Sequence, residues 1–248
     1  MVVRDALSAA LPAAGVGCAF YRPILARLAQ EREEAAGVPF SVESLTEDYE
    51  LGLAIKELGG RQRFLRLRGR DGRLIATRAC FPASFGPAVR QKTRWIHGIA
   101  LQGWDRLGWN GRPVELWMRM RDRRGPLTAI VLAVAYLLLL ISTVHLLAQL
   151  AGFGREWQAD GLVSFLAGAN LASFCWRVAM RFAFTAREYG TAEGLRAVAR
   201  IPVANFIAIT AGCRALIAYM RTLRGMMPHW DKTHHDAHPV LLSGRVPL

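Results

Sequence analysis

The chain has 248 residues, 52% of them hydrophobic, and its 32 lysines and arginines against 19 acidic residues give a formal net charge of +13. This length allows one or two domains with a core of their own, and the positive mean hydropathy of +0.19 argues against an ordinary soluble globule. The charge then has two explanations: a nucleic-acid surface, or a membrane protein whose cytoplasmic loops are rich in arginine.

The first part of the chain predicts mixed α/β structure. ALPAAGVGCAFYRPIL contains a glycine turn followed by a helix start, and Ser41–Gly60 predicts a helix that ends at its glycine pair. In RFLRLRGRDGRLIATRACF apolar and basic residues alternate around Asp71–Gly72, a hairpin turn signal. Six arginines between Arg61 and Arg73 fit the solvent face of such a ribbon better than a nucleic-acid site. A helix is then expected from about Ala88 to Trp104.

Three apolar segments follow. No charged residue lies between Arg124 and Arg155, which is long enough for a membrane helix over about 127–150. The preceding WMRMRDRR places the residues before Leu127 in the cytoplasm by the positive-inside rule. A second crossing over about 161–184 would return to the cytoplasm. The segment of about 201–220 is either an interfacial helix, which we favour because arginines flank both ends, or a third crossing.

The stretch SLTEDYELG has two interpretations. Ser44 or Thr46 can cap a helix, Ser44 and Glu47 have capping-box spacing, and Glu47 and Asp48 would lie at the positive end of the helix dipole. The functional alternative is that one carboxylate at this helix start acts as a general base toward a substrate hydroxyl.

The stretch QKTRW also has two interpretations. On a helix, Gln91, Arg94 and Trp95 are spaced i, i+3 and i+4, so they share one face. An indole beside a guanidinium and an amide suits a sugar ring next to a diphosphate. The alternative is a tryptophan anchored at the membrane surface with an arginine beside it.

In this order, the motifs TED and QxxRW, followed by basic residues and a membrane helix, resemble the C-terminal part of family 2 glycosyltransferases of the cellulose and hyaluronan synthase type. SLTEDYELG, GVGCAFYR and HWDKTHH are most similar to the bacterial inner-membrane branch that includes the phage-adsorption protein B group. The resemblance covers the chain from about Leu11 to His235. It implies a GT-A-like α/β domain that transfers sugar from a nucleotide-sugar donor to a glycan acceptor, usually with inversion.

The resemblance also implies roles for individual residues. Asp48 would be the catalytic base, with Thr46 and Glu47 positioning it. Gln91 and Arg94 would contact the donor diphosphate or the acceptor, and Trp95 would stack on the acceptor sugar. The complete family enzymes use a divalent metal, Mg or Mn, on the diphosphate, and QxxRW is associated with processive members.

One departure from the family pattern concerns the donor site. The family binds its metal through an Asp-x-Asp motif, and this sequence contains none. We therefore expect the polypeptide alone to be inactive, and either to be a fragment or to need a separate chain that carries the donor-binding half. The rival interpretation is a non-catalytic membrane scaffold or a degenerate remnant of such an enzyme. Nucleic acid is not an expected partner.

The resulting organisation has three parts: residues 1–115 as the acceptor-side part of the catalytic domain, 116–224 as the membrane module, and 225–248 as a cytoplasmic tail. We expect a multi-pass inner-membrane protein with its catalytic part facing the cytoplasm. The tail histidines (His229, His234, His235 and His238) have no fixed ligand geometry, so a packed tail is favoured over a metal site there. The cysteines (Cys18, Cys80, Cys175 and Cys213) are far apart and are expected to be buried or membrane-embedded thiols.

Overall fold

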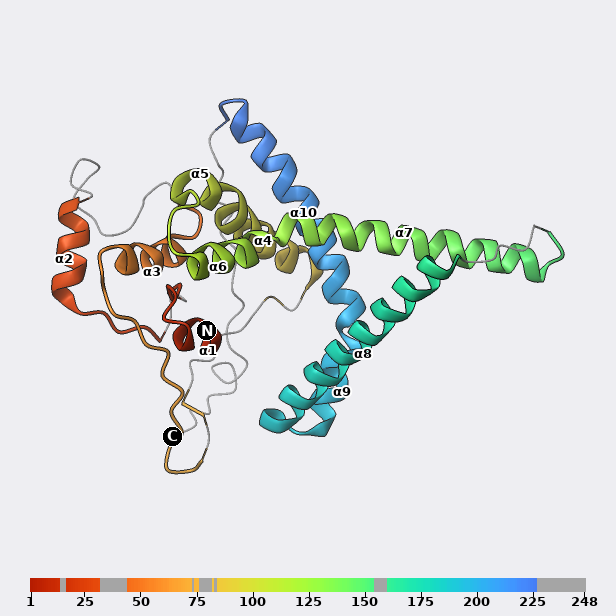
Figure 1. Ribbon diagram of the computed structural model, residues 1–248, viewed down its shortest axis with the longest axis horizontal. Helices are drawn as coiled ribbons and strands as arrows, with labels where there is room; N and C mark the ends of the chain where they lie inside the picture. Colours follow the sequence, from red (N-terminus) through yellow and green to blue (C-terminus); the bar gives the residue numbers. More distant parts are fainter. Residues whose placement is uncertain are drawn as a thin grey trace. The chain divides into compact units, whose positions relative to one another are not determined.

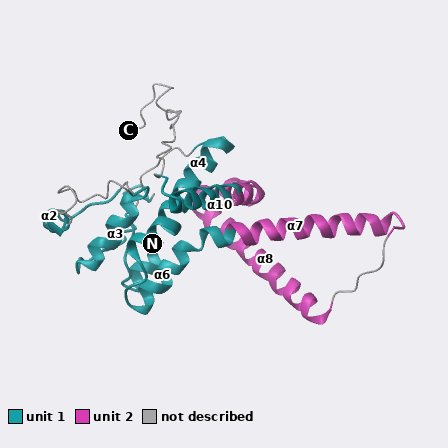
Figure 2. Cartoon of the chain, turned by 90° about the horizontal axis from the view of Figure 1, so that it is seen from above, with its two compact units in different colours: residues 1–128, 210–248 teal, residues 129–209 magenta. Residues whose placement is uncertain are grey.

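The computed structural model describes residues 1–13, 17–31, 44–72, 74–75, 82, 84–153 and 160–226. The chain divides into two compact units, residues 1–128 with 210–248, and residues 129–209 (Figure 2). Each unit is described by itself. Cys80 and the four tail histidines lie outside the described residues.

The first unit is built from short helices (Figure 1). The helix predicted over 88–104 is longer and changes type along its length. It runs as α4 (Phe85–Trp95), continues as a π-helical segment, η2 (Ile96–Gln102), and ends as α5 (Gly103–Leu107). Within the described residues, the other helices of this unit, apart from the start of α7 and the end of α10, are α1 (Val2–Ala6), α2 (Arg22–Glu31), α3 (Glu47–Glu57) and α6 (Pro113–Arg123).

Helix α3 forms the core of the first unit, because it is apolar on two faces. On one face Leu51, Ala54 and Ile55 pack with Leu28 of α2. On the other, Tyr49 and Leu53 pack with Ala10, and Ile99 and Leu107 adjoin them. Helix α3 covers 47–57 of the predicted 41–60, and residues 41–43 lie outside the described part. Because side chains on both faces of α3 are closely packed, the position of its first turn is fixed within the unit.

The predicted hairpin turn is confirmed, whereas the α/β class is not. Within the described residues the only β pairing is an isolated antiparallel bridge between Arg68 and Leu74. There the Ile75 amide donates to the Leu67 carbonyl at 2.9 Å. Gly72 turns the chain at φ +73°. The five arginines from Arg61 to Arg70 are exposed as expected, and Arg73 lies outside the described residues. Leu65 is also 70% exposed, so this ribbon does not bury that apolar side chain.

The apolar segments form long helices, α7 (Gly125–Leu150), α8 (Gly161–Tyr189) and α10 (Ile201–Leu223), with α9 (Thr191–Ala199) between the last two. All three are long and apolar enough to cross a membrane, the third included. Within the second unit, Gly194 of α9 lies so close to α8 that an added Cβ would be 2.9 Å from the Phe182 ring. Tyr136 of α7 stacks on Phe206 at 5.1 Å and accepts a hydrogen bond from the Asn205 amide at 3.2 Å.

The expectation of a buried or membrane-embedded thiol is wrong for Cys18, which is exposed in the non-helical segment that precedes α2. Cys175 and Cys213 are also free and exposed, and they lie on α8 and α10, both candidate membrane helices.

Candidate functional site

The turn Ser44–Thr46 leads into α3 and is buried. It ends at the threonine of the TED motif, so we call it the TED turn. Thr46 occupies the N-cap position, as one of the two predicted capping residues, but the prediction of a side-chain cap bond is wrong because neither residue makes one. The Ser44 hydroxyl instead donates to Glu50 Oε1 at 2.7 Å and accepts the Thr46 amide at 3.2 Å. A buried carboxylate one turn into the helix draws the serine away from the helix end, because a charge-assisted bond is stronger than a neutral cap.

Glu50 is the residue that sequence reasoning missed. It is only 2% exposed, and its carboxylate lies 3.2 Å from Arg106 Nε of α5. Taken out of water, a carboxylate needs such partners to be tolerated. An acidic residue inside an otherwise apolar helix was the available signal. The contacts of Glu50 with Ser44 and with Arg106 therefore connect the TED turn to α5.

The TED turn also contacts η2, the continuation of the QxxRW helix. An added Cβ on Gly98 would lie 2.6 Å from Thr46 Oγ1 and 2.7 Å from Thr46 Cγ2. The Leu45 amide donates to Gln102 Oε1 at 3.4 Å. π-helical segments often occur at functional sites, and here the segment brings a glycine and an amide side chain against the turn. The structure therefore connects the TED and QxxRW regions through Thr46 and Gly98.

The two carboxylates of the motif begin α3 and are partly exposed. Asp48 Oδ1 accepts the Tyr49 amide at 2.8 Å. The Tyr49 hydroxyl donates to Asp122 Oδ2 at 2.7 Å, and Asp122 also pairs with Arg4. Burial, together with the Asp122 charge, raises the pKa of Tyr49 strongly. Asp48 thus keeps access to solvent while the residue after it is anchored in the core.

The QxxRW residues differ in environment although they share one side of α4. Gln91 is buried and Arg94 is partly buried, whereas Trp95 is 39% exposed. Asp48 makes no hydrogen bond to Gln91 within the described part of the chain. The Thr93 hydroxyl donates to the Ala211 carbonyl of α10 at 3.4 Å. The motif is therefore anchored by α10 as well as by its own helix.

His97 is a second residue that the sequence did not single out. It is 5% exposed and lies edge-on to Tyr219, with ring centroids 6.2 Å apart. Its Nε2 has no hydrogen-bond partner within the described residues, and burial lowers the pKa of the imidazole. The Tyr219 hydroxyl meanwhile bonds Asp105 at 2.9 Å. His97 is thus a buried side chain, whose burial disfavours the charged imidazolium, beside the glycine that contacts the TED turn.

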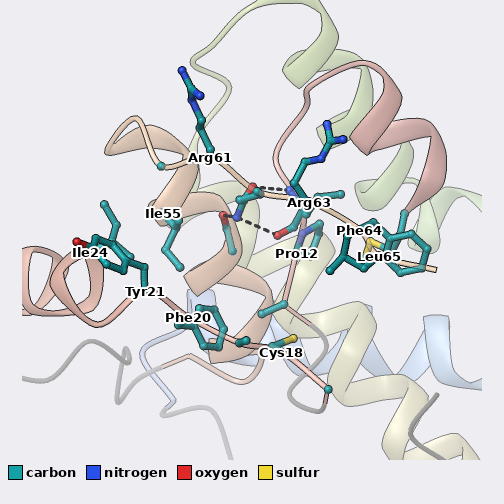
Figure 3. A pocket seen from close by; sticks show the side chains of 18 residues that line it. Pro12, Cys18, Phe20, Tyr21, Ile24, Ile55, Arg61, Arg63, Phe64 and Leu65 are labelled. Atoms are coloured by element: carbon teal, nitrogen blue, oxygen red, sulfur yellow. Dashed lines mark hydrogen bonds between the residues drawn. The ribbon is translucent and has the colours of Figure 1, made fainter. Parts of the chain in front are cut away.

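A hollow of about 610 Å³ lies on the α2 side of α3. Its floor is held by Gln62, whose side chain accepts the Leu11 amide at 2.8 Å and donates to the Gly52 carbonyl at 2.6 Å. Figure 3 shows Arg61 and Arg63 extending away from Phe20. The hollow is mainly apolar, and its arginines are directed to solvent.

The described residues do not fit a divalent metal. Within the described ranges, no three His, Cys, Asp or Glu side chains gather as possible ligands. Three carboxylates of the first unit are held by arginines: Glu50 by Arg106, Asp122 by Arg4, and Glu57 by Arg119 at 2.6 Å. No chemical step is therefore assigned to a metal on these residues.

Comparisons with known proteins agree with the family that the motifs resemble. Residues 1–155 match the family described as "Glycosyl transferase family group 2". The chain is 33% identical over 258 aligned residues to bacteriophage adsorption protein B of Escherichia coli K12 and to bacteriophage N4 adsorption protein B of E. coli O157:H7. In each case 94% of this chain aligns, and it spans 34% of the relative's length. No solved structure matches significantly. The chain therefore belongs to the family 2 glycosyltransferases and is a glycosyltransferase-like membrane protein.

Proposed function

We propose that this chain is the acceptor-side part of an inner-membrane glycosyltransferase that transfers a sugar from a nucleotide-sugar to a growing polysaccharide or surface glycan. The observation that carries the proposal is the packing of Thr46 of the TED turn against Gly98, directly after the QxxRW helix. This contact joins the two motifs to which the family resemblance assigns the chemistry. The partly exposed Asp48 carboxylate at the start of α3 suits a group that must meet a substrate.

In the proposed reaction Asp48 accepts the proton of an acceptor hydroxyl as the oxygen attacks the anomeric carbon of the donor sugar. The bond from that carbon to the nucleoside diphosphate breaks, and the diphosphate leaves with the bonding electrons. Attack from the opposite side inverts the anomeric centre. Thr46 and Glu47 hold the first turn of α3 so that Asp48 faces the acceptor.

The QxxRW residues serve the two substrates in this proposal. Trp95, 39% exposed, offers an apolar face for the acceptor sugar. Arg94 and Gln91 supply guanidinium and amide donors to the donor diphosphate or to the acceptor. Their places at the junction of α4 and η2 put them next to the segment that contacts the TED turn.

A donor-binding part completes the enzyme in this proposal. The sequence contains no Asp-x-Asp motif, and the relatives are about three times as long as the matched chain. The metal-binding and nucleotide-binding residues would come from a separate chain or from further polypeptide. The described chain alone is then inactive. The proposal also puts the first unit on the cytoplasmic side of the inner membrane, which the arginines before α7 support.

The test is sugar transfer in membranes from a panel of radiolabelled nucleotide-sugars. Three forms are compared: this chain alone, the chain joined to or expressed with a donor-binding part, and that completed form with Asp48→Asn. Asp71→Asn at the hairpin turn is the matched control, because it makes the same change on a residue outside the motifs. Transfer only in the completed form, lost in Asp48→Asn and kept in Asp71→Asn, is the expected result.

Two results would reject parts of this proposal. Transfer by the chain alone would show that no donor-binding part is needed. A completed form in which Asp48→Asn keeps full activity would remove Asp48 as the base. If no form transfers sugar, the non-catalytic scaffold or remnant is the better account, which the lack of Asp-x-Asp in the sequence also favours.

A further inference from the structure

The second unit contains a hollow of about 320 Å³ between α8 and the first turns of α10. Two arginines of α8, Arg177 and Arg181, line it together with Asn205 of α10. Apolar side chains, among them Phe174, Trp176 and Ile201, form the rest of the wall. The residues named as lining the hollow belong to the second unit, whereas the TED and QxxRW motifs belong to the first.

The two arginines are spaced i and i+4, so their guanidinium groups leave α8 on the same side. None of the described residues that line the hollow is acidic. In the described part of the chain no ion pair involves either arginine, whereas the nearby Glu193 is already paired with Arg196. Two positive charges for which the described residues supply no counter-ion are unfavourable on a helix that is apolar enough to enter a membrane.

The position of the arginines along α8 places them at a membrane boundary. Arg177 and Arg181 follow Gly161 by 16 and 20 residues, which at 1.5 Å per residue is about 24 and about 30 Å along the helix. The hydrocarbon core is about 30 Å thick. If α8 enters near Gly161, the guanidinium groups reach the opposite head-group level. The short helix α9 connects the end of α8 to α10, so Asn205 near the start of α10 lies at the same level.

We propose that this hollow binds the phosphate head group of an anionic membrane lipid. Arginine offers paired N–H donors that match phosphate oxygens, and basic pockets between membrane helices are a known type of lipid site. The apolar wall of Phe174, Trp176 and Ile201 would contact the start of the acyl chains. The inference rests on the proposed crossing of α8, and it is independent of sugar transfer.

The experiment counts lipid molecules that stay bound to the full chain. The protein is purified in neutral detergent, stripped of lipid, and titrated with phosphatidylglycerol or with phosphatidylcholine, and bound copies are measured by native mass spectrometry. The test variant is Arg177→Gln with Arg181→Gln. The control is Arg187→Gln with Arg200→Gln, which removes the same charge from the second unit outside the hollow.

We expect the wild type and the control to bind phosphatidylglycerol in preference to phosphatidylcholine. The test variant should bind it about tenfold more weakly, as expected for the loss of charge-assisted hydrogen bonds. Equal loss in both variants would mean general charge attraction and would overturn the site. Displacement of the lipid by inorganic phosphate at equal molarity would overturn the lipid assignment, because the apolar wall would then contribute nothing. Resistance of the chain to alkaline extraction from membranes tests the crossing separately.

Discussion

Replacement of Gly52 by alanine tests the packing on which the first unit depends. Gly52 lies in the middle of α3, where alanine ordinarily stabilises a helix by about 1 kcal/mol. Here the added Cβ would lie 2.2 Å from the Leu11 carbonyl oxygen, 2.6 Å from the Ala13 amide nitrogen and 2.7 Å from Pro12 Cα. All three are backbone atoms, so a side-chain rotation cannot relieve the overlap.

The expected cost follows from what must move. Segment 11–13 has to shift away from α3, which strains or breaks the two hydrogen bonds between Gln62 and Leu11 at 2.8 and 3.3 Å. Each is worth about 1 kcal/mol, and overpacking adds about 1–3 kcal/mol. After subtraction of the helix gain, Gly52→Ala should destabilise the protein by about 2–4 kcal/mol.

The measurement is thermal unfolding of the full chain in detergent, followed by tryptophan fluorescence. At about 2–4 °C per kcal/mol, Gly52→Ala should lower Tm by about 5–15 °C. Gly86→Ala in α4 is the control, because the nearest atom to its Cβ would be Arg90 Nη1 at 4.0 Å, and its Tm should be unchanged or higher. A Gly52→Ala protein as stable as the Gly86→Ala protein would refute the close approach of segment 11–13 to α3.

Three further predictions concern the surroundings of the TED turn. Glu50→Gln should destabilise the first unit by about 1–3 kcal/mol because it leaves a buried hydrogen-bond network incomplete. Glu57→Gln is the control: the Glu57 side chain is 55% exposed, so the change should cost under about 1 kcal/mol. Equal Tm shifts for the two variants would contradict the difference in burial. Gly98→Ala should destabilise by displacing Thr46, and Thr46→Ala in the same chain should recover part of the loss; additive effects in this double-mutant cycle would deny the contact. Burial lowers the pKa of His97, so as the pH drops below about 6.5 the unfolded chain takes up the proton first and the stability should fall. His97→Gln should reduce this fall in Tm measured from pH 7 to 5. An unchanged fall in Tm would exclude His97 as its source.

The long apolar helix and the hairpin turn were predictable because their signals are local. An uncharged run between Arg124 and Arg155 predicts a long apolar helix whatever surrounds it, and α7 covers it. Asp71–Gly72 predicts a hairpin turn because glycine accepts a positive φ, and Gly72 has one. The family resemblance needs only the order of TED and QxxRW, and the comparison over residues 1–155 agrees with it.

What the sequence could not reveal depends on contacts between residues far apart in the chain. The spacing of Ser44 and Glu47 predicts a capping box, but Glu50 takes the serine hydroxyl because Arg106, 56 residues later, makes a buried carboxylate tolerable. A glycine at position 98 carries no signal of its own, and it is needed because Thr46 packs against it. Local propensity therefore determined which helices form, whereas the surroundings of Asp48 follow from packing that brings α3, η2 and α5 together, since burial decides which polar groups must pair.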